Sequence, residues 1–254
     1  MAARSKLKRK SAMNPADSPP KNRLLSALHA ADYKRLAPHL ETVHMEMKQL
    51  AFDTNKPIEY AYFPLNGIFS MLTFMEGGKA VEVATIGNEG MLGLPLFLGV
   101  NSTPGVAFAQ VPGDSMRIPA GVFQKEVRRQ GGFAKILQIY TQALMVQISQ
   151  GMACNGIHLI QQRTARWLLM THDRVAARQF PLSQEFLGQM LGVRRASVSE
   201  VASKLQKAGL IRYSRGIIEI TDRAGLEATS CECYGVIQRE FDRLFGAPRK
   251  QGAQ

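Results

Sequence analysis

The sequence has 254 residues, of which 45% are hydrophobic and 20% charged, a composition that excludes fibrous and wholly disordered proteins. Its longest strongly apolar stretch, residues 91–100, contains two glycines and a proline and is far shorter than the ~20 residues that a membrane span needs. A basic N-terminus followed by a polar, proline-containing stretch argues against a secretory signal peptide. Three cysteines without a disulfide framework favour the reducing cytoplasm, and the length suits two small domains.

The net charge of +12 is concentrated at the two ends of the sequence. Residues 1–23 hold seven Lys and Arg against one Asp, residues 24–159 hold ten basic and ten acidic residues, and residues 160–254 hold fifteen basic and nine acidic residues. A basic C-terminal part favours a polyanionic partner, with nucleic acid first and an anionic membrane surface second. A merely solvated basic surface is the alternative, and charge alone does not decide.

The first segment, residues 1–22, is rich in Lys, Arg, Ser, Pro and Ala, which is typical of a disordered tail. Such a tail either touches DNA phosphates nonspecifically or only solubilises the chain, and the second alternative is favoured. A short helix is predicted over residues 24–40, because leucines recur along one of its faces.

A β-rich region begins at Thr42, where apolar and polar residues start to alternate. Turn-forming residues then recur at short intervals with β-prone runs between them. The predicted strands are Ile58–Phe63, Ile68–Phe74, Ala80–Ile86, Val106–Val111 and Ser115–Ile118. Short strands at this spacing indicate a sandwich or barrel, and the paired glycines at 77 and 78 predict a hairpin turn.

A long helix is predicted from residue 133 to about residue 155, since apolar residues recur at steps of three and four. Its apolar stripe consists of Phe133, Leu137, Tyr140, Leu144 and Ile148. The stripe packs either on the β region or on the same helix of a second copy, and the second alternative is favoured because paired helices suit dimeric DNA-binding proteins. Asn155-Gly156 is interpreted as a hinge, with a further helix over residues 158–175.

Residues 181–209 have the pattern of two helices joined by a tight turn. Ser183 is a suitable N-cap for the first helix, and Gly192 permits a sharp turn after it. The second helix starts at Arg194 or Arg195 and ends at residue 208, with Gly209 suited to the position after its end.

Residues 210–220 read as two strands joined by a polar turn, a wing that follows the two helices. Between residues 194 and 215 there are six basic residues and one acidic residue. This order predicts a winged helix-turn-helix whose second helix enters the DNA major groove. The alternative is a helical hairpin with a solvated basic edge.

These segments resemble a known family. Gln184–Ile220, above all residues 187–199, is similar to the helix-turn-helix of the Crp/Fnr family of bacterial transcription regulators, and Phe52–Gly67 and Gly87–Leu94 look like that family's cyclic-nucleotide-type β-roll. The resemblance covers about residues 24–222. It implies an α+β fold, in which an N-terminal β-roll is joined by a long dimerisation helix to a C-terminal winged helix-turn-helix. It also implies a homodimer that binds double-stranded DNA at an inverted-repeat promoter site, and leaves RNA polymerase open as a further partner.

For the DNA contacts, the resemblance implies that Arg195 reads a guanine, a bidentate pairing worth about 1–3 kcal/mol of discrimination. Ala196 and Glu200 stand where other members often place a glutamate and an arginine, so the target half-site is expected to differ. The residues expected to read bases are Arg195, Ala196, Ser199 and Glu200. Those expected to touch phosphates are Ser183, Gln184, Arg194, Ser197, Lys204, Arg212 and Arg215.

The sensor departs further from the family. A cyclic-AMP pocket needs a glutamate for the ribose and an arginine for the phosphate, whereas the matching positions hold Met91 and, approximately, Gly105. A buried phosphate without a cation would be uncompensated, so cyclic-nucleotide binding is not expected and the signal is unknown. The candidate effector pocket comprises Glu82, Glu89, Gly90, Met91, Leu92 and Gly93.

No metal site is expected from the sequence. The family's iron–sulfur sensors use an N-terminal cysteine cluster that this sequence lacks, so no iron–sulfur cluster is expected. Cys231 and Cys233 are placed inside a last helix over residues 222–245 and interpreted as ordinary buried cysteines without partners. The histidines show no metal-ligand spacing, although haem ligation by one of them stays open: His29, His39, His44, His158 and His172.

Enzymatic activity is not expected. The sequence lacks a P-loop, an HExxH motif, a GxSxG elbow and a dinucleotide fingerprint, and Glu82, Glu89 and Asp114 are isolated carboxylates. Two alternatives to a DNA-binding regulator remain. One is a regulatory subunit whose β-roll binds a ligand and whose C-terminal part contacts a protein, and the other is an enzyme that acts on a nucleotide.

The expected organisation has five parts: a disordered basic tail (1–23), a β-roll sensor (24–132), a dimerisation helix and hinge (133–156), a winged helix-turn-helix (157–228) and a C-terminal helix with a tail (229–254). A signal at the β-roll or the dimerisation helix is expected to reorient the winged helices through the hinge. Both recognition helices would then match successive major grooves about 34 Å apart.

Overall fold

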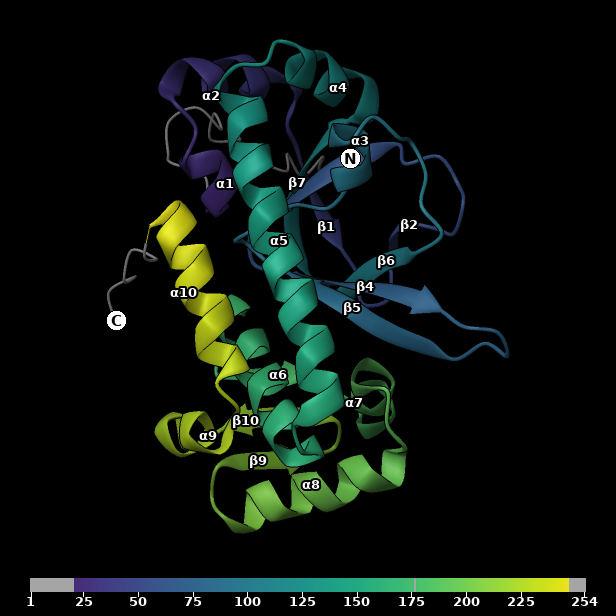
Figure 1. Cartoon of the computed structure of the whole chain (residues 1–254), viewed down its shortest axis with the longest axis vertical. Helices are drawn as coiled ribbons and strands as arrows, with labels where there is room; N and C mark the ends of the chain where they lie inside the picture. The colour runs from purple at the N-terminus through teal and green to yellow at the C-terminus, as the bar shows by residue number, and fades with distance from the viewer. Residues whose placement is uncertain (1–20, 176, 247–254) are drawn as a thin grey trace, which may run out of the picture.

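A long central helix joins a β-rich N-terminal region to a smaller, mainly helical C-terminal region (Figure 1). This computed structural model describes residues 21–175 and 177–246. The architecture is the predicted α+β arrangement of β-roll, long helix and winged helix-turn-helix. The predicted tail lies outside the described residues except for its last three, and of these Arg23 already begins the first helix.

The β-rich region consists of two antiparallel sheets, with strand orders β1-β7-β3 and β2-β6-β4-β5. The strands are β1 (Glu41–Met45), β2 (Leu50–Phe52), β3 (Tyr60–Pro64), β4 (Ile68–Phe74), β5 (Ala80–Ile86), β6 (Val106–Val111) and β7 (Gly113–Pro119). The predicted bounds of β4, β5 and β6 are confirmed. So is the hairpin turn between β4 and β5, where Gly77 and Gly78 have φ of +82° and +78°. Strand β2 is too short to show an alternation and is not predicted.

Three short helical segments precede the first sheet, in place of the single helix predicted over residues 24–40. They are α1 (Arg23–Ser26), α2 (Ala30–Leu36) and the 3₁₀ turn η1 (Ala37–His39). The break follows from capping, because the side chains of Asn22 and His29 each accept a hydrogen bond from backbone N–H groups that follow them.

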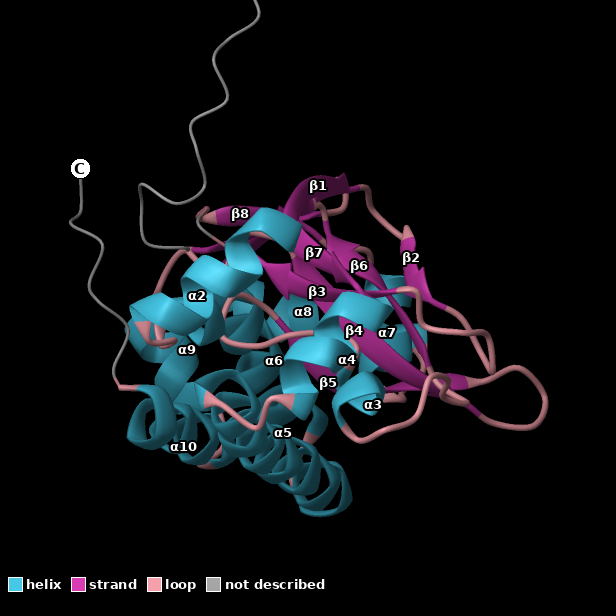
Figure 2. Ribbon diagram, turned by 90° about the horizontal axis from the view of Figure 1, so that it is seen from above, coloured by secondary structure: helices cyan, strands magenta, loops and turns pink. Residues whose placement is uncertain are grey.

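The central helix α5 (Gly132–Ile157) follows the shorter helices α3 (Leu94–Phe97) and α4 (Ala120–Arg128). Its stripe of Phe133, Leu137, Tyr140 and Leu144 is buried within the same chain. The prediction that this stripe packs on a second copy is therefore wrong, and the alternative of packing within the chain is right. Seen from above, α5 lies beside the sheets together with α10 (Cys233–Phe245) (Figure 2).

The break after α5 does not lie at Asn155-Gly156, as the glycine suggested. The helix passes through both residues, and the chain turns extended at His158 and Leu159, with ψ of 149° and 150°, before α6 (Ile160–Arg174). Glycine lowers the stability of a helix without ending it. The joint between the two regions is therefore at His158-Leu159.

The C-terminal region confirms the predicted winged helix-turn-helix. Helix α7 (Gln184–Leu191) and helix α8 (Arg195–Lys207) form the helical pair. The wing is a three-stranded sheet of order β8-β10-β9, made of β8 (Gln179–Pro181), β9 (Ile211–Ser214) and β10 (Ile217–Ile220).

The last predicted helix is broken into α9 (Arg223–Thr229) and α10. Cys231 and Cys233 therefore lie at the junction of two helices and not inside one. Helix α10 then runs antiparallel to α5 back toward the N-terminal region (Figure 1), where Asp242 pairs with Arg23 at 3.2 Å.

Candidate nucleic-acid interface and sensor cavity

Two glycines and a serine fix the angle between α7 and α8. The Ser183 hydroxyl oxygen accepts a hydrogen bond from the N–H of Phe186 at 3.1 Å and so caps α7. Gly192 has a φ of +66°, which a side chain would strain. A Cβ at Gly188 would lie 3.0 Å from the carbonyl oxygen of Val193, so glycine lets the two helices approach closely.

The N-terminal half of α8 presents its outer face to solvent at the lower end of the molecule (Figure 1). Of the residues predicted to read bases, Arg195, Ala196 and Glu200 are exposed. Ser199 is half-buried and its hydroxyl donates to Oε1 of Gln184 at 2.6 Å. The inner face is buried and consists of Val198, Val201, Ala202 and Leu205. The inner face of α8 is therefore packed within the protein, and its outer face is accessible to solvent.

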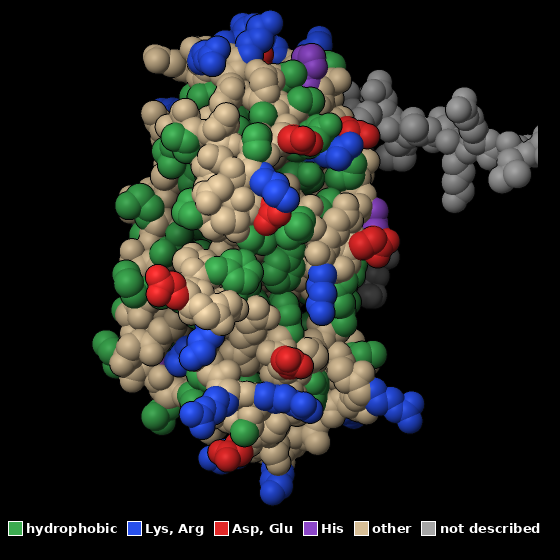
Figure 3. All heavy atoms as spheres, turned by 90° about the vertical axis from the view of Figure 1, so that its right-hand side faces the viewer, with side chains coloured by type: hydrophobic (Ala, Val, Ile, Leu, Met, Phe, Trp, Pro, Cys, Tyr) green, Lys and Arg blue, Asp and Glu red, His purple; other side chains and the backbone are tan. Residues whose placement is uncertain are grey.

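The residues predicted to touch phosphates surround the start of α8 and the wing. Lys204 is exposed, and Arg215 stands at the wing turn with a φ of +49°. Arg212 pairs with Glu219 at 3.0 Å, so part of its charge is offset, and Ser197 is half-buried in the first turn of α8. Among the residues predicted to contact DNA, four cations form no ion pair within the described ranges: Arg194, Arg195, Lys204 and Arg215. Lys and Arg side chains gather at this end of the molecule (Figure 3).

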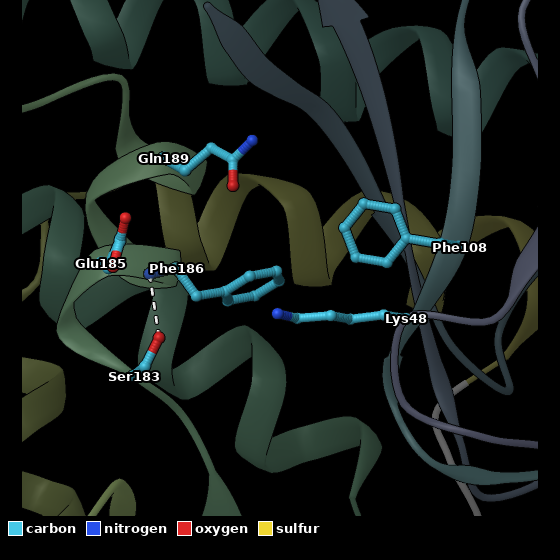
Figure 4. Close-up of a pocket in the computed structure, with 6 residues that line it drawn as sticks. All are labelled: Lys48, Phe108, Ser183, Glu185, Phe186 and Gln189. Carbon is cyan, nitrogen blue, oxygen red and sulfur yellow. Dashed lines mark hydrogen bonds between the residues drawn. The ribbon is translucent and has the colours of Figure 1, made fainter.

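Helix α7 lies against the β-rich region. The ring of Phe186 meets the ring of Phe108 on β6 edge-on, with centroids 6.0 Å apart. A cleft of about 410 Å³ opens beside this contact. Figure 4 shows Lys48 and Phe108 on its β-region wall, facing Ser183, Glu185, Phe186 and Gln189 of the helical pair. The β-rich region and the DNA-binding helices therefore touch directly.

A second cavity of about 280 Å³ lies where β5, α5, α6 and α7 meet. Its walls are mostly apolar, and its polar side chains include Glu82, Arg166 and Trp167. Glu82 accepts a hydrogen bond from the indole N–H of Trp167 at 2.7 Å, and burial raises the pKa of this carboxyl. The cavity touches the sheet, the central helix and the winged helix-turn-helix at once.

Glu89, another residue predicted for the effector pocket, forms an ion pair with Arg174. It is buried, and its Oε1 accepts a hydrogen bond from Nε of Arg174 on α6 at 2.8 Å. A Cβ at Gly87 would lie 2.7 Å from the Arg174 side chain, so the glycine makes room for this arginine. The loop after β5 is thereby tied to α6.

The residues after Glu89 also pack in the interior, and two of them contact Tyr140 of α5. A Cβ at Gly90 would lie 2.6 Å from the phenol oxygen of Tyr140 on α5, and that phenol donates to the carbonyl oxygen of Met91 at 2.9 Å. Met91 and Leu92 are buried, and Gly93, the residue before α3, has a φ of +97°. Of the predicted effector residues, only Glu82 lines the 280 Å³ cavity. Residues 89–93 line neither of the two cavities described above, and they pack between the sheet and the helices.

Four residues with metal-binding side chains, from two distant segments of the sequence, meet at the lower end of α5. The Sγ atoms of Cys154, Cys231 and Cys233 and a ring nitrogen of His158 all lie within 4.8 Å of one another. The expectations that the cysteines lack partners and that His158 stands alone are therefore wrong. The available signal is the spacing, since Cys154 and His158 are four residues apart at the end of α5 and Cys231 and Cys233 are two apart.

Comparison with known proteins agrees with this architecture. Residues 162–229 match the Crp-like helix-turn-helix domain. No curated protein sequence matches the chain. Within the described residues, no helix is both long and apolar enough to span a membrane.

Several solved structures share the fold. FixK2 from Bradyrhizobium japonicum is 18% identical over 76% of this chain and 98% of its own, with a TM-score of 0.62. A putative Crp/Fnr-family transcriptional regulator from Eubacterium rectale is 18% identical over 81% of this chain and 96% of its own, with a TM-score of 0.64. A CRP-family transcriptional regulator from Thermus thermophilus is 17% identical over 74% of this chain and 96% of its own, with a TM-score of 0.63.

Proposed function

We propose that this chain is a Crp/Fnr-type transcription regulator, and that it acts as a homodimer on an inverted-repeat promoter site in the cytoplasm. The match of residues 162–229 to the Crp-like helix-turn-helix domain supports the DNA-binding part of this proposal. The observation that carries the proposal is the outward face of α8, which presents guanidinium groups without carboxylate partners in the described chain. The major groove of DNA is wide enough to admit such a helix.

On this proposal, Arg195 reads a guanine through its two parallel N–H donors, and the side chains of Ala196, Ser199 and Glu200 set the neighbouring base preferences. Phosphate contacts position the helix without reading sequence. The groups proposed for them are Ser183, Gln184, Arg194, Ser197, Lys204, Arg212 and Arg215. Because Arg212 is paired with Glu219, its contribution is the smallest of the cations.

The proposed dimer forms along the outer face of α5 and the joint after it. Met145, Met152, Ile157 and Leu159 there are 59%, 70%, 79% and 72% exposed. Met145 and Met152 are seven residues apart on α5 and therefore lie on one face of the helix, as do residues of helices that pair along a seam. A second copy on this face buries these side chains. It also covers the edge of the 280 Å³ cavity, because Met152 belongs to both.

The effector is proposed to bind in that cavity. Its volume of about 280 Å³ suits a small molecule, and the apolar walls with Glu82 select a ligand that carries a hydrogen-bond donor. A ligand there contacts the sheet, α5, α6 and α7 together, so it can favour one orientation of the winged helix over another. The proposed domains are residues 24–132 for the sensor, 133–156 for the dimerisation helix, 157–228 for the winged helix-turn-helix and 229–254 for the C-terminal part.

The test is recovery of genomic DNA fragments by the purified chain, with sequencing of the bound fraction at increasing salt. We expect an inverted repeat whose affinity falls linearly on a log–log salt plot. Arg195→Ala should lose the repeat, whereas Arg128→Ala, an exposed arginine on α4, should keep it. Absence of any repeat from a folded dimer, with and without added small-molecule extract, would favour a regulatory subunit that acts through protein contacts.

A further inference from the structure

We infer that Cys154, His158, Cys231 and Cys233 form a mononuclear zinc site at the joint between the β-rich region and the winged helix-turn-helix. Cys154 and His158 come from the last turn of α5 and its C-cap, and the other two ligands flank the start of α10. Three thiolates and an imidazole are a ligand set that binds Zn²⁺ in proteins.

The spacing of the ligand atoms fits one ion. The Sγ atoms of Cys154 and Cys231 are 3.5 Å apart, and Sγ of Cys233 is 3.5 Å from Nδ1 of His158. A tetrahedral Zn²⁺ with Zn–S bonds of ~2.3 Å places its sulfurs ~3.8 Å apart. An iron–sulfur cluster inserts several atoms between its cysteines and needs a wider opening than these four atoms leave.

The neighbours of the ligands orient them for a metal. Nδ1 of His158 faces the sulfurs, while its Nε2 lies 3.2 Å from Oε2 of Glu232. A carboxylate on the far nitrogen is the usual arrangement for a zinc-bound imidazole, because it fixes the tautomer and the ring orientation. The side-chain amide of Gln150, one turn before Cys154, donates to Sγ of Cys233 at 3.1 Å.

The positive charges around the four ligands also favour a negatively charged metal centre. Arg163 and Arg166 of α6 are buried and, within the described ranges, form no ion pair with a carboxylate, and the Nε atom of each is buried without a hydrogen-bond partner. Both guanidinium groups interact electrostatically with Cys154. Three thiolates around Zn²⁺ carry a net charge of −1, which offsets part of the charge of these two cations, whereas neutral thiols offset none of it. Glu82 also interacts electrostatically with Arg166.

A site with four protein ligands is closed and structural, because no coordination position is left for a substrate. Here it clamps the end of α5 to the start of α10, on either side of the winged helix-turn-helix. Occupancy of the site therefore fixes how this region is held on the central helix.

The first test is elemental analysis of the chain purified without chelator. We expect about one zinc per chain in the wild type and in His39→Gln, whose imidazole is exposed, and none in Cys233→Ser or His158→Gln. Iron with acid-labile sulfide would overturn the zinc assignment. So would a metal-free protein whose three thiols react freely, or one that contains a Cys154–Cys231 disulfide.

A second measurement does not depend on the folding of a variant. Wild-type protein stripped of metal is titrated with Co²⁺, and we expect the intense visible bands of tetrahedral thiolate-bound cobalt, which Zn²⁺ then abolishes by displacement. Glu232→Gln should weaken zinc affinity by ~10–100-fold without changing the ligand count, while Glu185→Gln, on the exposed side of α7, should leave it unchanged. Octahedral cobalt spectra, or no binding, would reject the site.

Discussion

Glu89 and Arg174 form a buried ion pair, with Nε of the arginine 2.8 Å from Oε1 of the glutamate, between the loop after β5 and the last residue of α6. Arg174 also donates to the carbonyl oxygen of Met170 at 2.7 Å and approaches Oε1 of Gln147 on α5 at 3.4 Å. One guanidinium thus connects the sensor loop, the central helix and the first helix of the C-terminal region.

Removing the charge of Glu89 should destabilise the fold strongly, because Arg174 would be left as a buried cation without its carboxylate. We expect Glu89→Gln to lower the free energy of unfolding by about 3 kcal/mol, measured by urea denaturation. Glu41→Gln, which breaks the exposed pair with Arg117 at 2.8 Å, should cost no more than about 1 kcal/mol. If the two variants lose the same free energy of unfolding, the buried Glu89–Arg174 pair stabilises the protein no more than the exposed Glu41–Arg117 pair.

Arg195 and Lys204 should affect DNA binding differently. Arg195→Ala is expected to reduce discrimination between the recovered repeat and its guanine-substituted form by about 1–3 kcal/mol, since a base contact is lost. Lys204→Ala should weaken binding to all sequences and lower the salt slope by about 1, since a phosphate contact is lost. Fluorescence anisotropy over a range of salt measures both. If the two variants behave alike, Arg195 is not a base-reading residue.

A charge on the outer face of α5 should break the proposed dimer. Met152→Glu places a carboxylate at the seam between the two copies, where desolvation makes it unfavourable. Light scattering is expected to give the mass of one chain for this variant and of two for the wild type. Leu98→Glu is the matched control, because Leu98 is 61% exposed in the β-rich region, away from the seam. If both variants have the mass of two chains, the dimer interface lies elsewhere on the molecule.

His172 should make the fold sensitive to acid. Burial and the adjacent Arg223 lower the pKa of this imidazole below its ordinary value of 6.5, while Asp173 opposes the shift. Nδ1 of His172 lies 2.9 Å from Nη1 of Arg223 on α9, and a neutral imidazole accepts that hydrogen bond. A base with a lowered pKa binds fewer protons in the native state than in the unfolded state, so the free energy of unfolding falls as pH drops through about 6.5.

The comparison variant is His172→Gln, which cannot be protonated. We expect wild type to lose more stability than this variant between about pH 7.5 and about pH 5, as seen in urea denaturation. The difference between the two proteins isolates this imidazole from the other titrating groups. Parallel curves for the two proteins would show that His172 titrates as it does in the unfolded chain.

The sequence predicts best what depends on neighbouring residues. Strands β4 and β5, on either side of Gly77 and Gly78, follow from β-prone runs and turn chemistry, and the α7–α8 pair follows from the capping serine at 183 and the glycine at 192. In each case the signal lies within about ten residues of its effect. The family resemblance adds the order of the parts, which local patterns alone leave open.

Contacts between distant segments are what the sequence does not predict. Cys154 and Cys231 are 77 positions apart and meet only because α10 folds back along α5. The roles of Gly87 and Gly90 depend on distant segments in the same way. These glycines make room for Arg174 and Tyr140, side chains from helices that begin more than 40 residues later.

The antiparallel return of α10 along α5 has one further consequence. The chain enters the winged helix-turn-helix at the end of α5 and leaves it at the start of α10, and these two points are adjacent in space. Segments whose ends lie together can be exchanged between proteins without disturbing the host. A helix-turn-helix of different sequence preference, grafted between Leu159 and Ser230, would answer to the same sensor if it kept Arg174, which pairs with Glu89, and the residues of α6 and α7 that line the 280 Å³ cavity.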